Sequence, residues 1–314
     1  MANCNDLFRD FEDALTLSSS QKEELRNSRD AVKNTIIGYF KTNNILVPDF
    51  RQQGSFDIGT IIKPADNTPY DIDYGIYLKE LPESTSEKQQ IETVKSWIWK
   101  AVENQTDCKP LNKKNCIRIF YKNKYNIDLP VYKEVNGISY LGTRDSGWQE
   151  SNPKDFSDWF FKRLNETDAQ MRRVVKYLKA SVDYKNINFK SIAITIAVAQ
   201  KYFKADKRDD FSFTKTLEAI IFYIENAKSV LKPVKPYENV LSSNQENISL
   251  LVENLKKVLY IANECIILSD SDKHIASKKW RSIFGDRFKT VEKDKAISST
   301  YVSPQSPKPW KING

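Results

Sequence analysis

Apolar and polar positions alternate in two different ways along the chain. Between residues 47 and 140 the apolar runs are short, repeat every second residue and are separated by Pro, Asn, Gly and Lys, which is the pattern of a small sheet. The clearest strands are predicted at residues 70–78, 116–121 and 125–132, with Lys122-Asn123-Lys124 as the hairpin turn between the last two. A helix is predicted at residues 88–102.

Helical spacing dominates on both sides of this segment. Ser20 and Glu23 stand in capping-box spacing and open a long helix that continues to about residue 41. After Trp148 apolar residues recur at helical spacing, as in Met171, Val174, Val175, Leu178 and Val182. The pattern predicts helices at residues 167–182, 191–203, 214–231, 246–268 and 272–284, the last ending at Gly285.

This order predicts an α+β fold, with a mixed sheet in the head and a helical bundle after it. A chain of 314 residues is long enough for two packed domains. We expect a catalytic head with its long N-terminal helix at residues 1–150, a helical domain closing the site at 151–297, and a flexible Ser-, Pro- and Lys-rich tail at 298–314.

Composition limits the cellular location, the catalytic residue types and the ligands that we expect. No run approaches the roughly 18 apolar residues of a membrane span, and the acidic, amphipathic N-terminal stretch does not resemble a secretory signal, so we expect a cytoplasmic protein away from membranes. The four cysteines include no Cys-x-x-Cys pair, and His274 is the single histidine. Catalytic groups are therefore expected among carboxylates, and the net charge of +8 favours an anionic ligand.

Two carboxylates project from one face of the strand YDIDYGIYL. A period of two separates Asp71 and Asp73 from the apolar side chains of Ile72 and Ile76. Mg²⁺ prefers hard oxygen ligands and commonly binds one or two carboxylates together with substrate phosphates. Asp-x-Asp alone is also common on solvated strands.

Two further features strengthen this hypothesis. Gly54-Ser55 precedes the strand, where a glycine lets a phosphate approach the backbone and a serine can cap a short helix. Asp128 alternates with the apolar residues of YNIDLPVY, and a neighbouring strand would bring it near the other two aspartates. Three carboxylates around two metal ions, Mg²⁺ or Mn²⁺, form a phosphoryl-transfer site, with Asp128 helping to accept the hydroxyl proton. Alternatively, Asp128 only protects a strand edge.

The order of these motifs resembles the DNA polymerase β-like nucleotidyltransferases. Within them, the chain resembles the cyclic GMP-AMP synthase and DncV-like nucleotidyltransferases (CD-NTases) of bacterial antiphage CBASS systems. The similar segments are QQGSFDIGT, YDIDYGIYL, NIDLPVY, MRRVVKYLKASVDYK, NFKSIAITIAVA and ASKKWRSIFGDRF. The resemblance implies a polymerase-β-like head and synthesis of a cyclic di- or trinucleotide second messenger from ribonucleoside triphosphates such as ATP and GTP, sensed by a downstream effector.

The resemblance also implies roles for individual residues. Gln53, Gly54 and Ser55 would bind the triphosphate, and Asp71, Asp73 and Asp128 would be the catalytic metal ligands. Lys176 and Ser191 match a lysine and a serine that hold the triphosphate tail, and Lys179 continues a basic stripe on the same helix. A solvated helix face would show the same stripe, and Ser191 fits a helix N-cap equally well.

The sequence also leads to expectations about binding partners and leaves alternative functions open. No His/Cys cluster matches the zinc insertion with which the animal synthases engage DNA, so we expect a monomer that needs no nucleic acid. The exposed C-terminal Gly314 allows a conjugating enzyme as partner, although a frayed terminus is the simpler interpretation. Other functions left open are terminal nucleotidyl transfer to RNA or to a small acceptor, and a catalytically dead nucleotide-binding scaffold.

Overall fold

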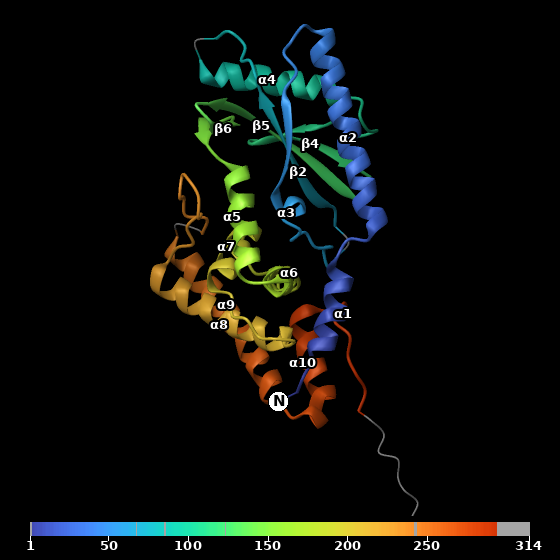
Figure 1. Cartoon of the computed structure of the whole chain (residues 1–314), viewed down its shortest axis with the longest axis vertical. Helices are drawn as coiled ribbons and strands as arrows, with labels where there is room; N and C mark the ends of the chain where they lie inside the picture. Colours follow the sequence, from blue (N-terminus) through green and yellow to red (C-terminus); the bar gives the residue numbers. More distant parts are fainter. Residues whose placement is uncertain (1, 67, 85, 123, 242–243, 294–314) are drawn as a thin grey trace, which may run out of the picture.

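A sheet-bearing head and a helical half lie one above the other (Figure 1). The computed structural model describes residues 2–66, 68–84, 86–122, 124–241 and 244–293. The predicted tail and Gly314 lie outside these residues, so conjugation at Gly314 stays a prediction.

The head contains a seven-stranded mixed sheet with the order β1-β2-β5-β4-β3, to which β6 and β7 are added beside β5. Only β2 and β5 pair in parallel; every other described pair is antiparallel. The predicted strands are present. The strands are β1 (Asp49–Gln53), β2 (Tyr70–Leu78), β3 (Leu111–Asn112), β4 (Cys116–Tyr121), β5 (Tyr125–Val135), β6 (Ile138–Thr143) and β7 (Gly147–Glu150).

Two helices cover one face of this sheet, α2 (Ser19–Thr42) and α4 (Glu87–Val102). The apolar alternation of the strands explains the packing, because Ile72, Ile76 and their counterparts on β4 and β5 are fully buried beneath these helices. The polar positions of the same strands therefore face the opposite side. The helix start differs from the prediction: Ser18 and Gln21 form the capping box instead of Ser20 and Glu23.

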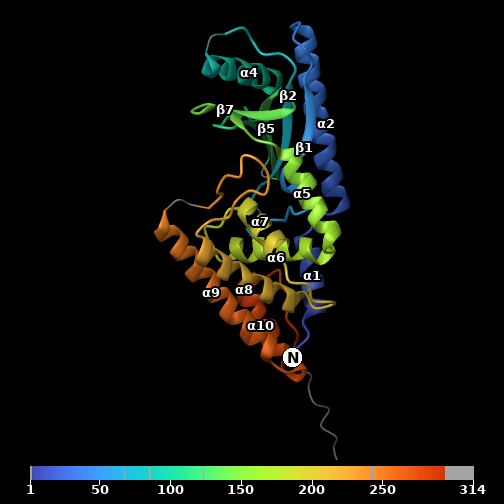
Figure 2. The ribbon, with the colours of Figure 1, turned by 60° about the vertical axis from the view of Figure 1, so that its left-hand side comes forward.

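The helical half contains the remaining long helices (Figures 1 and 2). Helical structure was predicted throughout the chain after Trp148, but α5 was not given bounds of its own. The other helices match predicted segments to within a few residues, and α8 begins before residue 214 and ends before residue 231. These helices are α5 (Pro153–Glu166), α6 (Ala169–Tyr184), α7 (Ser191–Lys201), α8 (Asp209–Ala227), α9 (Gln245–Ile267) and α10 (Lys273–Phe284). The predicted order of a mixed sheet followed by helices is confirmed.

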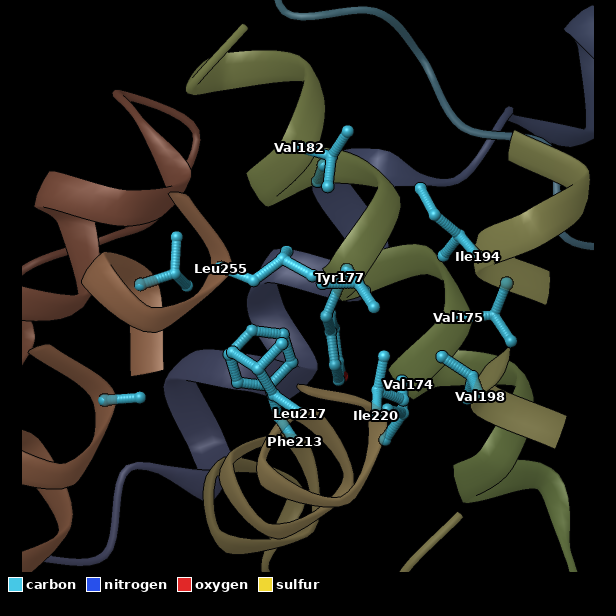
Figure 3. Packing of buried hydrophobic residues seen from close by; sticks show 14 of the residues in the cluster. Val174, Val175, Tyr177, Val182, Ile194, Val198, Phe213, Leu217, Ile220 and Leu255 are labelled. Carbon is cyan, nitrogen blue, oxygen red and sulfur yellow. The ribbon is translucent and has the colours of Figure 1, made fainter. Parts of the chain in front are cut away.

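The first helix, α1 (Asn5–Leu15), packs against the helical half, and the Leu15 carbonyl at its end accepts from the Lys63 amide of the head at 2.9 Å. Phe8 lies edge-on to Tyr177 and Trp280, and the Tyr177 hydroxyl donates to the Phe8 carbonyl at 2.9 Å. Figure 3 shows Tyr177 of α6 beside Phe213 and Leu217 of α8 in this core. The predicted division at residues 1–150 and 151–297 remains a prediction, and this packing places residues 2–15 with the second part.

No helix within the described ranges has the length and apolar character needed to cross a membrane.

Candidate active site

The register of β2 and β5 brings the three aspartates together on the face of the sheet opposite α2 and α4. Asp73 pairs directly with Asp128 across the two parallel strands, and Asp71 pairs with Asn126. All three aspartates line one cavity of about 520 Å³. The neighbouring strand therefore brings Asp128 beside the Asp-x-Asp pair, and an isolated strand-edge position does not describe it.

The Asp73 carboxyl group is the least compensated of the three. Burial, followed by repulsion from Asp128 and Asp71, raises the pKa of Asp73 to about 7. Among the described residues, no donor hydrogen-bonds to its carboxylate. A carboxylate without donors, beside two others, is a place where a cation would be favourable.

Arg118 lies across the other two carboxylates and was not predicted from the sequence. Its Nε and Nη2 donate to the two oxygens of Asp128 at 2.7 and 2.8 Å, and Nη2 also donates to Asp71 Oδ2 at 2.5 Å. Asn126 Nδ2 donates to the other oxygen of Asp71 at 2.9 Å, and Lys113 Nζ lies 3.7 Å from Asp128. The predicted hairpin could have revealed this contact. A turn at residues 122–124 pairs residue 121 with residue 125 and therefore places residue 118 opposite residue 128.

The donor set fits a divalent cation in its chemistry. Carboxylate oxygens are the ligands that Mg²⁺ and Mn²⁺ prefer, and Asp73 has no competing donor in the described part of the chain. With Arg118 in place, however, no group of three or more described His, Cys, Asp or Glu side chains is arranged to hold a metal ion. Three candidate ligands are thus close together, and the Arg118 guanidinium spans two of them.

The turn between β1 and the short helix α3 (Gly54–Asp57) lies against Asp73. Gly54 has a φ of +73°, and a Cβ placed there would overlap Asp73 Oδ2 and lie 3.1 Å from Asp73 Cγ. Ser55 lines the cavity, and its carbonyl accepts from the amides of Thr60 and Ile61 at 2.8 and 3.1 Å. The predicted Gly54-Ser55 turn thus adjoins the carboxylates.

Gln53 is placed differently from its neighbours in this turn. Its side chain is buried and donates to the Tyr132 hydroxyl at 3.0 Å, so the amide is directed into the sheet although the residue borders the cavity. Its Oε1 is a buried atom without a hydrogen-bond partner among the residues that the structure describes.

The helical half supplies the opposite wall of the cavity. Lys179 of α6 and the exposed Ser191 at the start of α7 both line it. Lys179 Nζ donates to the carbonyl and the hydroxyl of Thr60, each at 3.1 Å, and burial, followed by repulsion from Lys176, lowers its pKa to about 7. Lys190 holds the N-cap position of α7, so the N-cap interpretation of Ser191 is wrong.

Lys176 is not part of this wall. Its ammonium group binds Glu12 Oε1 at 3.1 Å and Thr16 Oγ1 at 3.0 Å, both in the N-terminal segment, and the residue is absent from the lining of the cavity. Burial lowers the pKa of Lys176, an effect that Glu12 opposes. The two lysines therefore face different surroundings although both belong to one basic stripe.

A loop after α8 also reaches the cavity, and the sequence pattern did not predict it. Lys228 ends α8 with a φ of +50°, and the chain then folds back through a bridge between Leu231 and Asn239. Lys232, Val234 and Lys235 of this loop line the cavity. Two further lysines thus border a site that already contains Lys179.

Comparison with known proteins defines the class. The chain matches solved structures of a cyclic AMP-GMP synthase, DncV of Vibrio cholerae, with a TM-score of 0.77 and 18% identity, over 92% of this chain and 98% of that one. DncV in complex with the linear intermediate 5′ pppA(3′,5′)pG matches with a TM-score of 0.77, 17% identity and coverage of 92% and 97%. The fold is therefore that of the DncV nucleotidyltransferase.

Sequence comparison agrees with this fold. Residues 48–132 match the family described as "Cyclic GMP-AMP synthase DncV-like, nucleotidyltransferase domain", and the predicted resemblance is confirmed. A c-di-GMP synthase of Roseivirga ehrenbergii is 25% identical in an alignment of 223 positions that covers 59% of this chain. The chain matches 56% of that relative's length.

Proposed function

We propose that the protein is a metal-dependent nucleotidyltransferase that joins ribonucleoside triphosphates into a cyclic di- or trinucleotide. One observation carries the proposal: the parallel register that sets Asp73 opposite Asp128, beside Asp71, in a cavity bordered by Gly54 and Ser55. Two similarities support the proposal. Residues 48–132 match the DncV-like nucleotidyltransferase domain, and the chain is similar to a cyclic AMP-GMP synthase and to a c-di-GMP synthase. The product would serve as a second messenger for a downstream effector in antiphage defence.

Each wall of the cavity has a proposed task. Asp71, Asp73 and Asp128 would hold two Mg²⁺ or Mn²⁺ ions, which when bound neutralise charge on the phosphates and activate the acceptor hydroxyl. Because Gly54 has no side chain, the turn approaches the Asp73 carboxylate closely. Ser55 beside it borders the cavity, where its hydroxyl would donate to a phosphate. Lys179 and Ser191 would hold the rest of the triphosphate from the opposite side.

The activity is tested by product analysis. We expect the purified chain, given the four ribonucleoside triphosphates and Mg²⁺ or Mn²⁺, to form a phosphatase-resistant oligonucleotide that mass spectrometry identifies as cyclic. The product should form without DNA or RNA and disappear when EDTA removes the metal. Transfer of a nucleotide to an added RNA or small acceptor without any cyclic product would refute the proposal, and so would strict dependence on added nucleic acid.

Lys179 and Lys176 of α6 provide a matched test of whether the cavity wall formed by the helical half binds the triphosphate. We expect Lys179→Gln to weaken binding of a nonhydrolysable triphosphate by about tenfold, because it removes a cation that borders the cavity. Lys176→Gln should leave affinity nearly unchanged and instead lower the free energy of unfolding by about 1–3 kcal/mol, because it breaks the contact with Glu12. Calorimetric titration and chemical denaturation measure these effects.

The change of triphosphate affinity with pH provides a second test of Lys179. In the free chain Lys179 is charged below a pKa of about 7, and a bound triphosphate favours the charged form. Its share of the affinity is therefore present below pH 7 and declines as the pH rises. We expect the ratio of wild-type to Lys179→Gln affinity to be larger at pH 6.5 than at pH 8.5. A larger loss of affinity in Lys176→Gln than in Lys179→Gln would contradict the assignment.

A further inference from the structure

Arg118 uses the oxygens that the proposed metal ions would need. Three of its hydrogen bonds occupy both oxygens of Asp128 and one oxygen of Asp71, at 2.5 to 2.8 Å. Asn126 occupies the remaining oxygen of Asp71. The hydrogen bond to Asp128 is the main reason that the pKa of Arg118 lies above its usual value. Of the three carboxylates, only Asp73 has no donor within the described residues.

We propose that Arg118 is an internal counter-cation that closes the metal site to free divalent cations and opens it to a metal that arrives with a nucleoside triphosphate. The inference rests on the proposed function of the site. It adds that metal and nucleotide bind as a coupled pair, and that one residue of the chain creates the coupling.

Charge balance gives the physical reason. A free divalent cation that displaced Arg118 would leave the guanidinium without a carboxylate partner beside a new positive charge, with Lys113 already 3.7 Å from Asp128. Within the described part of the chain, Asp71 and Asp128 are the only carboxylates that Arg118 binds. A triphosphate brings several negative charges with its metal. Guanidinium and phosphate form strong bidentate pairs, so the nucleotide can replace the partners that Arg118 loses.

Metal binding to the nucleotide-free chain tests the proposal directly. Mn²⁺ binding is measured by the loss of the free-ion signal in electron paramagnetic resonance, with and without a nonhydrolysable triphosphate. Wild-type protein should bind Mn²⁺ weakly alone and much more tightly with the nucleotide. Arg118→Met should bind Mn²⁺ alone about tenfold more tightly than wild type, since even one charge-assisted hydrogen bond corresponds to about that factor. The effect of the nucleotide should shrink accordingly.

A second arginine of the same sheet provides the matched control. Arg51 pairs with Glu134 through Nη1 at 2.6 Å and Nη2 at 2.9 Å, and among the described residues its guanidinium binds none of the three aspartates. Arg51→Met therefore removes a bidentate guanidinium elsewhere and should leave Mn²⁺ binding unchanged. Arg118→Lys keeps the charge and loses the bidentate geometry, so it should give an intermediate affinity even if Arg118→Met folds poorly.

Several outcomes would overturn the proposal. Equal Mn²⁺ affinity of wild type with and without nucleotide would remove the coupling. Unchanged or weaker Mn²⁺ binding in both Arg118 variants would mean that Arg118 holds the carboxylates in place and does not compete with the metal ion for them. These readouts need no turnover, so a chain that makes no cyclic product but shows the predicted Mn²⁺ behaviour would refute the proposed reaction and keep the role of Arg118.

Discussion

Asp73→Asn and Asp128→Asn are each expected to reduce product formation by at least about 1,000-fold while the protein stays folded. The neutral amide keeps the shape of the side chain but removes a charge at a site where metal ions would supply several kcal/mol of charge stabilisation in the transition state. Initial rates of product formation, measured by mass spectrometry at saturating Mg²⁺ and triphosphate, give the size of the effect.

A surface aspartate provides the control for this loss. Asp145 is exposed and pairs with Lys114 at 3.1 Å, so Asp145→Asn removes the same charge within the head but away from the cavity. Its rate should stay within about twofold of wild type. Circular dichroism and thermal melting establish that the variants are folded. Near-normal turnover in a folded Asp71→Asn/Asp73→Asn double variant would end the catalytic assignment.

The sequence could predict the central strands because their two faces differ sharply. In Tyr70–Leu78 every second residue is apolar or aromatic and buried: Ile72, Tyr74 and Ile76. Asp71 and Asp73 occupy the alternate positions and point the other way. The same alternation placed Asp128 opposite the apolar side chains of its strand. Periodicity thus identified the strand faces, and the order of the motifs along the chain gave the family resemblance.

Register was the information that periodicity alone did not provide. Arg118 alternates with the buried Ile117 and Ile119, so its face was readable, but its pairing with Asp128 depends on the hairpin register. The strand β6 was missed in a similar way. Its turn carries Asn136-Gly137 with positive φ at both residues, a strong hairpin signal, between strands with weak alternation.

Long-range packing explains the remaining differences. Lys176 binds Glu12 and Thr16, whereas Lys179 binds Thr60. The basic stripe on α6 does not reveal these contacts, because all three partners lie far away in the sequence. The docking of α1 on the helical half depends in the same way on Phe8 reaching Tyr177 and Trp280. Helical spacing predicts that such residues share a helix and says nothing about which neighbour covers each side.

Gly54→Ala is expected to cost about 100-fold or more in turnover, because a misplacement of about 1 Å in a reacting group can have that effect. The added methyl group would overlap Asp73 Oδ2, so either the carboxylate or the turn that carries Ser55 must move. The same substitution also places an L-residue at a φ of +73°, which by itself costs about 1–2 kcal/mol of stability. A control must separate these two effects.

Gly137→Ala is that control, because Gly137 has a φ of +76° and, apart from its chain neighbours, no described heavy atom lies within 4 Å of the added Cβ. Both variants should lose a similar amount of unfolding free energy from the backbone, measured by chemical denaturation, but only Gly54→Ala should lose turnover. If Gly54→Ala keeps a rate within about threefold of Gly137→Ala, the close approach between this turn and Asp73 does not matter for the reaction. A loss of turnover confined to Gly54→Ala, at matched stability, would instead assign to this glycine the task of letting the turn that carries Ser55 lie directly against the Asp73 carboxylate.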